Sequence, residues 1–203
     1  WSNITDLSKW VITQLNHGKY GEGLNKNLFS ESMHEEMWSP QTIIKSATRP
    51  PYNTHFSAYG LGWFLSDIKG YKQVTHTGGL AGIVTQVVLF PELNLGIIVL
   101  TNQQSGAAFN SISSTIKDGY LGVSGQNWVK TFSEREKQGF AEAEKIKQKV
   151  NADITSSQEK NSGFNINPYL GTYHDAWFGD VVLSIKNGDR KSTRLNSSHI
   201  TIS

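Results

Sequence analysis

The sequence predicts an α+β fold in which an antiparallel sheet is flanked by helices and followed by a truncated, small β domain. Three observations support this prediction: an amphipathic helix pattern near the start, two consecutive hairpin patterns between residues 59 and 102, and another helix pattern directly after them. Strands joined by short turns pair antiparallel, and neighbouring helices cover the resulting sheet. The 203 residues suffice for one domain and part of a second.

Two helices are predicted at the start of the chain. Ile4–Asn16 places apolar side chains at helical spacing, and either Asn3 or Thr5 can serve as its N-cap. Ser30–Trp38 is predicted as a shorter helix capped by Ser30. Both helices are amphipathic, so we expect each to bury one face.

Two hairpins follow and form most of the predicted sheet. Tyr59–Ser66 and Tyr71–Gly78 are rich in aromatic and β-branched residues, and Asp67–Gly70 is the expected turn between them. Gly82–Phe90 and Leu95–Asn102 make the second hairpin, with a proline-led turn of four residues. Four consecutive strands with short connections predict a meander.

A third helix, Ala107–Leu121, is predicted to pack back on this sheet. Phe109, Ile112 and Ile116 stand at helical spacing and form its expected buried face.

The composition changes after residue 122 and divides the chain. We expect residues 1–122 to belong to the first domain, residues 123–165 to be a charged helical linker, and residues 166–188 to be a truncated β domain. Within the linker, residues 127–150 are predicted to form a solvated helix and residues 151–163 to be flexible.

The last fifteen residues, 189–203, resemble the in-frame translation of a short-read sequencing adapter. That adapter begins GATCGGAAGAGC, which encodes Asp189, Arg190, Lys191 and Ser192. We expect the segment to be foreign to the natural protein. The segment carries Asp189, Arg190, Lys191 and Arg194, and so contributes the whole formal net charge of +2. The rest of the chain is then neutral, and no nucleic-acid partner is predicted.

The stretch with the most chemical character is His76-Thr77-Gly78-Gly79, at the end of a predicted strand. Gly78 lets a ligand approach the backbone closely, and His76 can donate a hydrogen bond beside that ligand. The amide of Gly79 can point at a developing oxyanion, as acyl-transfer enzymes require. On residue types alone, a glycine-rich hairpin corner with an exposed histidine is the simpler interpretation. A phosphate-binding loop is excluded, because no Gly-Lys-Ser/Thr ending or following helix is present.

Several segments resemble the β-lactamase-related serine hydrolases, a family that includes β-lactamases, penicillin-binding proteins and D-aminopeptidase-like enzymes. The resemblance covers about residues 2–122, and a later segment is similar to a β domain often appended to these hydrolases. The segments that carry it are Asn3–Trp10, Glu36–Trp38, Tyr59–Trp63, His76–Gly79, Leu100–Asn102 and, in the β domain, Tyr169–Tyr173.

The resemblance implies an enzyme in which three motifs meet in one cleft. Ser-x-x-Lys supplies the nucleophile and a base, Tyr-x-Asn a proton-transfer group, and Lys/His-Thr/Ser-Gly the strand that lines the cleft. Only the third motif is found here, at His76, and the other two are expected upstream of Trp1. The string Ser66-Asp67-Ile68-Lys69 fits the first motif but spans a predicted turn, so we interpret it as chance. The fragment itself is therefore predicted to be inactive.

The resemblance further implies roles for the motif residues. His76 would orient the substrate and tune proton transfer, Thr77 would bind a substrate carboxylate or carbonyl, and Gly79 would donate to the oxyanion. A histidine in place of lysine is commoner in the esterase-like and D-peptide-cleaving members than in dedicated β-lactamases.

Partners and surroundings are also implied by the resemblance. We expect a small-molecule or peptide substrate, no cofactor and no metal; the oligomeric state is not predicted. A bacterial parent that is periplasmic or secreted is implied, although no signal segment is visible. Without cysteine, no disulfide or thiolate metal site is predicted. Solvated surface is expected for His17, His34, His55 and His174.

Two other hypotheses stay open at this stage. One is a non-catalytic homologue that kept the fold and acts as a binding protein. The other makes the terminal β domain a ligand-binding module.

Overall fold

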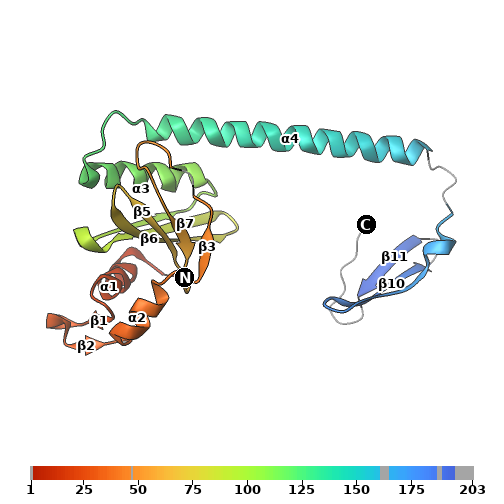
Figure 1. The fold of residues 1–203 in the computed structure, drawn as a ribbon. Helices are drawn as coiled ribbons and strands as arrows, with labels where there is room; N and C mark the ends of the chain where they lie inside the picture. The colour runs from red at the N-terminus through yellow and green to blue at the C-terminus, as the bar shows by residue number, and fades with distance from the viewer. Residues whose placement is uncertain (1, 47, 161–164, 187–188, 195–203) are drawn as a thin grey trace. The chain divides into compact units, whose positions relative to one another are not determined.

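The computed structural model describes residues 2–46, 48–160, 165–186 and 189–194. The chain forms two compact units, Trp1–Glu142 and Ala143–Ser203 (Figure 1). Predictions for residues 161–163, 187–188 and 195–203 fall outside the described part of the chain.

The first unit is built on a six-stranded sheet in which every pair of neighbours is antiparallel. The spatial order follows the chain order, so the sheet is a meander, as the two hairpin patterns predict. Its strands are β3 (Thr42–Ile44), β4 (Ser57–Tyr59), β5 (Phe64–Ile68), β6 (Tyr71–Leu80), β7 (Ile83–Phe90) and β8 (Leu95–Thr101).

The sheet buries both faces, because successive side chains of a strand point to opposite sides. One core packs against α3 (Gly106–Leu121), and the other packs against α1 (Ile4–Leu15). Figure 1 shows these two helices on opposite sides of the sheet. The predicted architecture, an antiparallel sheet flanked by helices, is therefore confirmed. The α3 core contains Val88, Phe90, Ile97, Val99 and Phe109, and the α1 core contains Val11, Trp38, Leu65, Val74 and Leu89.

The first helices begin where their caps predict. The side chain of Asn3 accepts a hydrogen bond from the backbone N–H of Asp6 at 3.0 Å and so caps α1. Ser30 caps α2 (Glu31–Met37) by accepting from the N–H of Met33 at 3.2 Å. Between the two helices lies a small hairpin that was not predicted, β1 (Lys19–Tyr20) and β2 (Lys26–Asn27), with the short 3-10 helix η1 (Glu22–Leu24) in its turn.

The prediction that His34 is solvated is wrong. Its side chain is only 3% exposed and lies against the rings of His17, Phe29 and Trp38. The buried face of α2 is the His34 face, whereas Met33 is 62% exposed. Burial lowers the pKa of His34, because a charged imidazole is poorly solvated there.

The predicted buried face of α3 is also wrong in part. Phe109 is buried, but Ile112 and Ile116 are 46% and 40% exposed. The buried face combines Phe109 and Leu121 with polar side chains. Asp118 lies within it because the loop before β4 and the first turn of the next helix cover it with aromatic rings. Its buried polar residues are Ser111, Ser113, Ser114 and Asp118.

The turn of the first hairpin is shorter than predicted. Strand β5 continues through Ile68, and the turn consists of Lys69 and Gly70, both with positive φ. Asp67 is held in the strand because its carboxylate accepts hydrogen bonds from the backbone N–H groups of His55 and Phe56, at 2.7 and 2.9 Å. Burial alone would raise the pKa of Asp67, but these bonds and the His55 ring hold it below its ordinary value. The second hairpin turns through the 3-10 helix η2 (Pro91–Leu93).

Beyond residue 122 the chain forms one long helix and a small sheet. Helix α4 runs from Trp128 to Lys160, so residues 151–160, predicted to be flexible, are helical. The second unit contains the 3-10 helix η3 (Asn167–Tyr169) and a sheet in the order β11-β10-β9. Its strands are β9 (Gly171–Asp175), β10 (Gly179–Lys186) and β11 (Asp189–Arg194), the last within the adapter-like segment. None of the described helices combines the length and apolarity of a membrane span.

Candidate active site

The His76–Gly79 motif lies where strand β6 extends past the end of its neighbour β5. The last β5–β6 pair is Phe64 with Thr75, whereas β7 stays paired with β6 as far as Leu80. Within the described residues, His76–Leu80 therefore has a partner strand on one edge only. Backbone N–H and C=O groups alternate between the two edges of a strand, so this segment offers free hydrogen-bonding groups on its open edge.

A hollow of about 410 Å³ lies beside the motif. Gly78 and Gly79 line it together with Leu7 of α1 and Leu100 of β8. A Cβ added to Gly78 would come within 2.6 Å of the Thr85 Oγ1 atom, so glycine is required there by close packing. A Cβ on Gly79 would meet nothing within 4 Å, so its residue type is not explained by packing.

The imidazole of His76 is held by hydrogen bonds at both ring nitrogens. The Nδ1 atom lies 2.6 Å from the carbonyl oxygen of Thr77, and the Nε2 atom lies 3.0 Å from the hydroxyl oxygen of Tyr59. Phe64 stacks against the same ring, with centroids 5.7 Å apart and planes at 25°. In a neutral ring this arrangement uses the only N–H, and none is left for a ligand.

Thr77, Gly78 and Gly79 are exposed. The expected roles of the four motif residues toward a substrate stay predictions. The sequence did not point to Tyr59 or Phe64 as partners of His76, although both stand in the Tyr59–Ser66 segment. The register of the strands could have indicated these partners, because it aligns Tyr59 with Phe64 and Phe64 with Thr75, the residue before His76.

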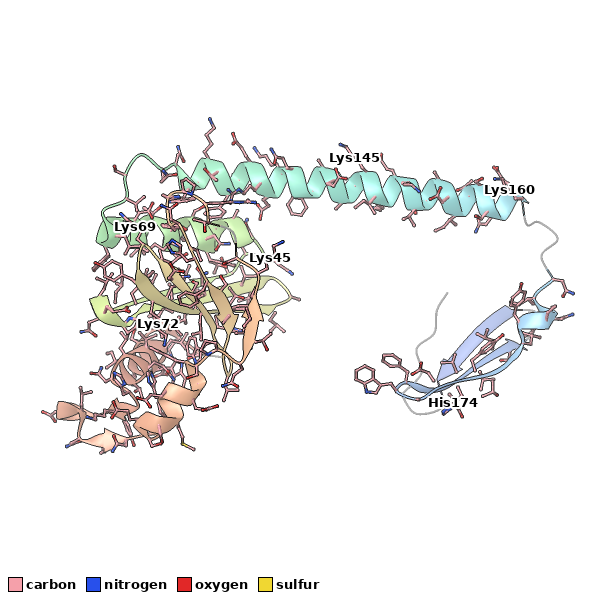
Figure 2. The ribbon with its side chains drawn as sticks, viewed as in Figure 1. Lys45, Lys69, Lys72, Lys145, Lys160 and His174 are labelled. Atoms are coloured by element: carbon pink, nitrogen blue, oxygen red, sulfur yellow. The ribbon has the colours of Figure 1, made fainter. Side chains whose placement is uncertain are left out.

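The string Ser66–Lys69 crosses a hairpin turn, as predicted. The Ser66 hydroxyl accepts a hydrogen bond from the Gln73 side chain at 3.2 Å. The Lys69 ammonium, labelled in Figure 2, donates to the carbonyl of Leu121 at 3.0 Å, at the end of α3. Neither group opens a helix, so the string lacks the geometry of the family's first motif.

Sequence reasoning missed two further strings of this type: Ser157–Lys160, at the end of helix α4, and Ser114-Thr115-Ile116-Lys117, which lies within helix α3. Scanning the predicted helix for Ser-x-x-Lys would have found the second of these. Ser114 is 4% exposed and belongs to the α3 side of the sheet. The Lys117 ammonium lies 4.3 Å from the centroid of the Tyr52 ring. Because Ser114 is covered, we assign this pair to packing rather than to catalysis.

The surroundings of Lys117 change its titration. Burial lowers the pKa of Lys117 to about 8, while the charge of Asp118 opposes that shift. The same cluster raises the pKa of Tyr52, through burial and through the Asp118 carboxylate. Among the described residues, no group of three His, Cys, Asp or Glu side chains could hold a metal ion.

Replacing Lys117 with methionine is expected to change how stability depends on pH. Between pH 8 and the ordinary lysine pKa, the unfolded chain keeps a proton on Lys117 that the folded chain has released, so the wild type gains stability as pH rises. The variant lacks this gain. We therefore expect the free energy of unfolding of the wild type, relative to that of the variant, to rise by about 3 kcal/mol between pH 7 and pH 10.5. Urea unfolding at pH 7 and pH 10.5 measures it.

Lys149→Met is the control for this experiment, because Lys149 is exposed on α4. Its unfolding free energy should follow the wild type at both pH values. A Lys117→Met curve parallel to the wild type would contradict the prediction.

Comparison with known proteins places these features in context. A family model described as Beta-lactamase matches residues 1–117. The chain is 27% identical over 182 residues to the unguisins hydrolase ungD' of Aspergillus campestris (strain IBT 28561), a match that covers 87% of the chain and 32% of that protein. It is 21% identical over 213 residues to the unguisins hydrolase ungD of Aspergillus violaceofuscus (strain CBS 115571), covering 98% of the chain and 37% of that protein.

The chain thus spans about a third of the length of these two relatives. Both are fungal, so they lend no support to the expectation of a bacterial parent.

Proposed function

The chain belongs to the β-lactamase family, and from this membership we propose that its parent protein is a serine hydrolase that cleaves an amide or ester bond through an acyl-enzyme. The observation that carries the proposal is the His76–Gly79 segment of β6. It stands inside the family match and keeps one edge free of any described strand. Such an edge can bind the backbone of a substrate.

Each motif residue has a role in this proposal. The Gly79 amide donates to the oxyanion that forms when the acyl carbonyl is attacked, and fixed donors of this kind lower the barrier of acyl transfer. The Thr77 hydroxyl binds a carboxylate or carbonyl of the substrate. His76, whose Nδ1 atom is bonded to the Thr77 carbonyl, orients the substrate through that backbone. The serine nucleophile and its lysine base come from a part of the parent outside these 203 residues.

The names of the relatives suggest the substrate class to test. Two proteins similar to this chain are named as hydrolases of unguisins. We therefore propose an unguisin as a candidate substrate of the parent protein, to be tested beside a chromogenic ester, a D-peptide and a β-lactam. Turnover of the β-lactam alone would assign the parent to antibiotic hydrolysis instead.

The 203-residue chain by itself is expected to give no burst of product with an acylating substrate. A burst requires a nucleophile that forms a covalent intermediate faster than it releases it, and no Ser-x-x-Lys string opens a helix among the described residues. Labelling with a fluorescent penicillin, read on a denaturing gel, measures this directly. Stoichiometric labelling would contradict the expectation. Loss of that label in Ser114→Ala would then identify the buried pair in α3 as the nucleophile.

The proposal is tested on the intact parent, obtained by extending the gene upstream. His76→Ala is expected to lower kcat/KM for the chromogenic ester by about tenfold or more, because it removes the motif's imidazole. His174→Ala, in the second unit, is the matched control and should leave the rate unchanged; His174 is labelled in Figure 2.

Two results would overturn the proposal. Unchanged turnover by His76→Ala would remove His76 from the mechanism. No turnover by the wild-type parent, with no Ser-x-x-Lys at the start of an upstream helix, would favour the alternative of a non-catalytic binding protein.

A further inference from the structure

We infer that Tyr59 is a positioning residue for His76: the Thr77 carbonyl selects the Nδ1–H form of the imidazole, and the Tyr59 hydroxyl stabilises that form by donating to Nε2. The inference deepens the proposed function and rests on it, since the role matters only if the motif lines an active site. Tyr59 acts through His76.

The hydrogen bonds determine the tautomer. A carbonyl oxygen can only accept, so the His76 Nδ1 atom, 2.6 Å from the Thr77 carbonyl, must carry a proton. In a neutral imidazole the other nitrogen is then an acceptor. The Tyr59 hydroxyl, 3.0 Å from Nε2, therefore donates its proton to that nitrogen.

The aromatic rings around His76 hold this arrangement in place. Tyr59 and Phe64 are directly paired residues of β4 and β5, and their rings meet edge to face with centroids 4.7 Å apart. Phe64 in turn stacks on the imidazole at 5.7 Å. Both side chains stand on paired strands, so the tyrosine hydroxyl reaches Nε2 from a rigid base.

The proton on the His76 Nδ1 atom also orients the backbone at the open edge of β6, through one peptide unit. The Nδ1–H of His76 anchors the carbonyl of Thr77, and that carbonyl shares a planar peptide group with the amide of Gly78. Fixing the plane fixes the direction of the Gly78 amide and the start of the Gly78–Gly79 segment. Tyr59 thus orients the backbone that the proposed function assigns to substrate and oxyanion binding.

The test is the nitrogen-15 spectrum of the histidine rings, recorded on the 203-residue chain at a pH where its imidazoles are neutral. Long-range proton–nitrogen correlations distinguish the Nδ1–H from the Nε2–H tautomer, and His76→Gln identifies the His76 signals by their loss. We expect His76 to be an Nδ1–H tautomer in the wild type. In Tyr59→Phe, which lacks the donor, the Nε2 resonance should shift and the Nε2–H tautomer should gain population.

Tyr52→Phe is the matched control, because it removes a tyrosine hydroxyl that donates to Asp118 instead. It should leave the His76 signals at their wild-type positions. An Nε2–H tautomer in the wild type would overturn the inference, and so would a Tyr59→Phe spectrum identical to that of the wild type.

The wild-type spectrum decides the tautomer even if a variant fails to fold. The measurement needs no turnover, so its failure is distinct from the failure of the proposed hydrolase activity.

Discussion

Replacing Asp118 with alanine is expected to lower the free energy of unfolding by about 4 kcal/mol. Asp118 is 6% exposed. Its carboxylate accepts from the Tyr52 hydroxyl at 2.6 Å and from the Trp128 indole N–H at 2.5 Å. The substitution removes the carboxylate that accepts from the buried Trp128 indole and from the half-buried Tyr52 hydroxyl, and a buried donor left unsatisfied costs roughly 1–3 kcal/mol.

These bonds connect three distant segments, which is why the loss is concentrated here. Tyr52 comes from the loop before β4, Asp118 from α3 and Trp128 from the first turn of α4, and the rings of Tyr52 and Trp128 stack at 5.7 Å. Chemical unfolding followed by tryptophan fluorescence measures the effect.

Two further variants separate this network from a general loss of charge. Asp118→Asn keeps one acceptor and should lose about half as much stability. Asp153→Ala removes an exposed acid that pairs with Lys149 on α4, and should change stability by less than about 0.5 kcal/mol. An Asp118→Ala protein as stable as Asp153→Ala would show that Tyr52 and Trp128 find other acceptors.

Replacing Gly96 with valine is expected to lower the free energy of unfolding by about 3 kcal/mol, because it overfills the core between β8 and α1. A Cβ at this position would lie 2.2 Å from the Val11 Cγ1 atom and 3.5 Å from the Leu89 Cδ2 atom. Val11 and Leu89 are both buried, so neither can move away into solvent. Thermal unfolding followed by circular dichroism measures the change.

Gly79→Val is the matched control in the same sheet, since a Cβ there meets nothing within 4 Å. Valine suits a strand, so this variant should be as stable as the wild type or slightly more stable. Val11→Ala in the Gly96→Val background should restore part of the loss by making room. If Gly79→Val and Gly96→Val were equally destabilised, the cause would be a general intolerance of substitution in the sheet.

The parts of the fold that depend on neighbouring residues were predictable from the sequence. Asn3 and Ser30 cap their helices as expected, because a cap is a contact across three residues. The two hairpins were predicted as well, since each strand pairs with the next along the chain. The first strand was misplaced, because the predicted Tyr59–Ser66 spans the end of β4 and the start of β5. The turn at Lys69–Gly70 was misplaced by two residues, because Asp67 takes its hydrogen bonds from a loop twelve residues away.

The parts that depend on distant contacts were not predictable. Ile112 and Ile116 have the apolar character of a buried face, yet Asp118 is the buried residue, because Tyr52 and Trp128 satisfy it. The apolar pattern of α3 carries no information about those partners.

The same distinction between neighbouring and distant contacts applies to the candidate site. The motif at His76 was found because its residues are contiguous. Tyr59 was missed because it reaches the His76 ring across β5, between two strands that do not pair with each other.

The one-sided pairing of His76–Leu80 also has a consequence for evolution. Thr77 to Leu80 are exposed, so their side chains add little to the stability of the sheet, whereas His76 is half-buried and bonded to Tyr59. A lineage that no longer needed the chemistry would lose the motif by drift without unfolding, and only selection for activity would retain it. Gly78 is the exception, since Thr85 would resist any larger residue there. In a set of homologues, an intact Thr77 is therefore evidence of use, whereas an intact Gly78 is evidence only of the fold.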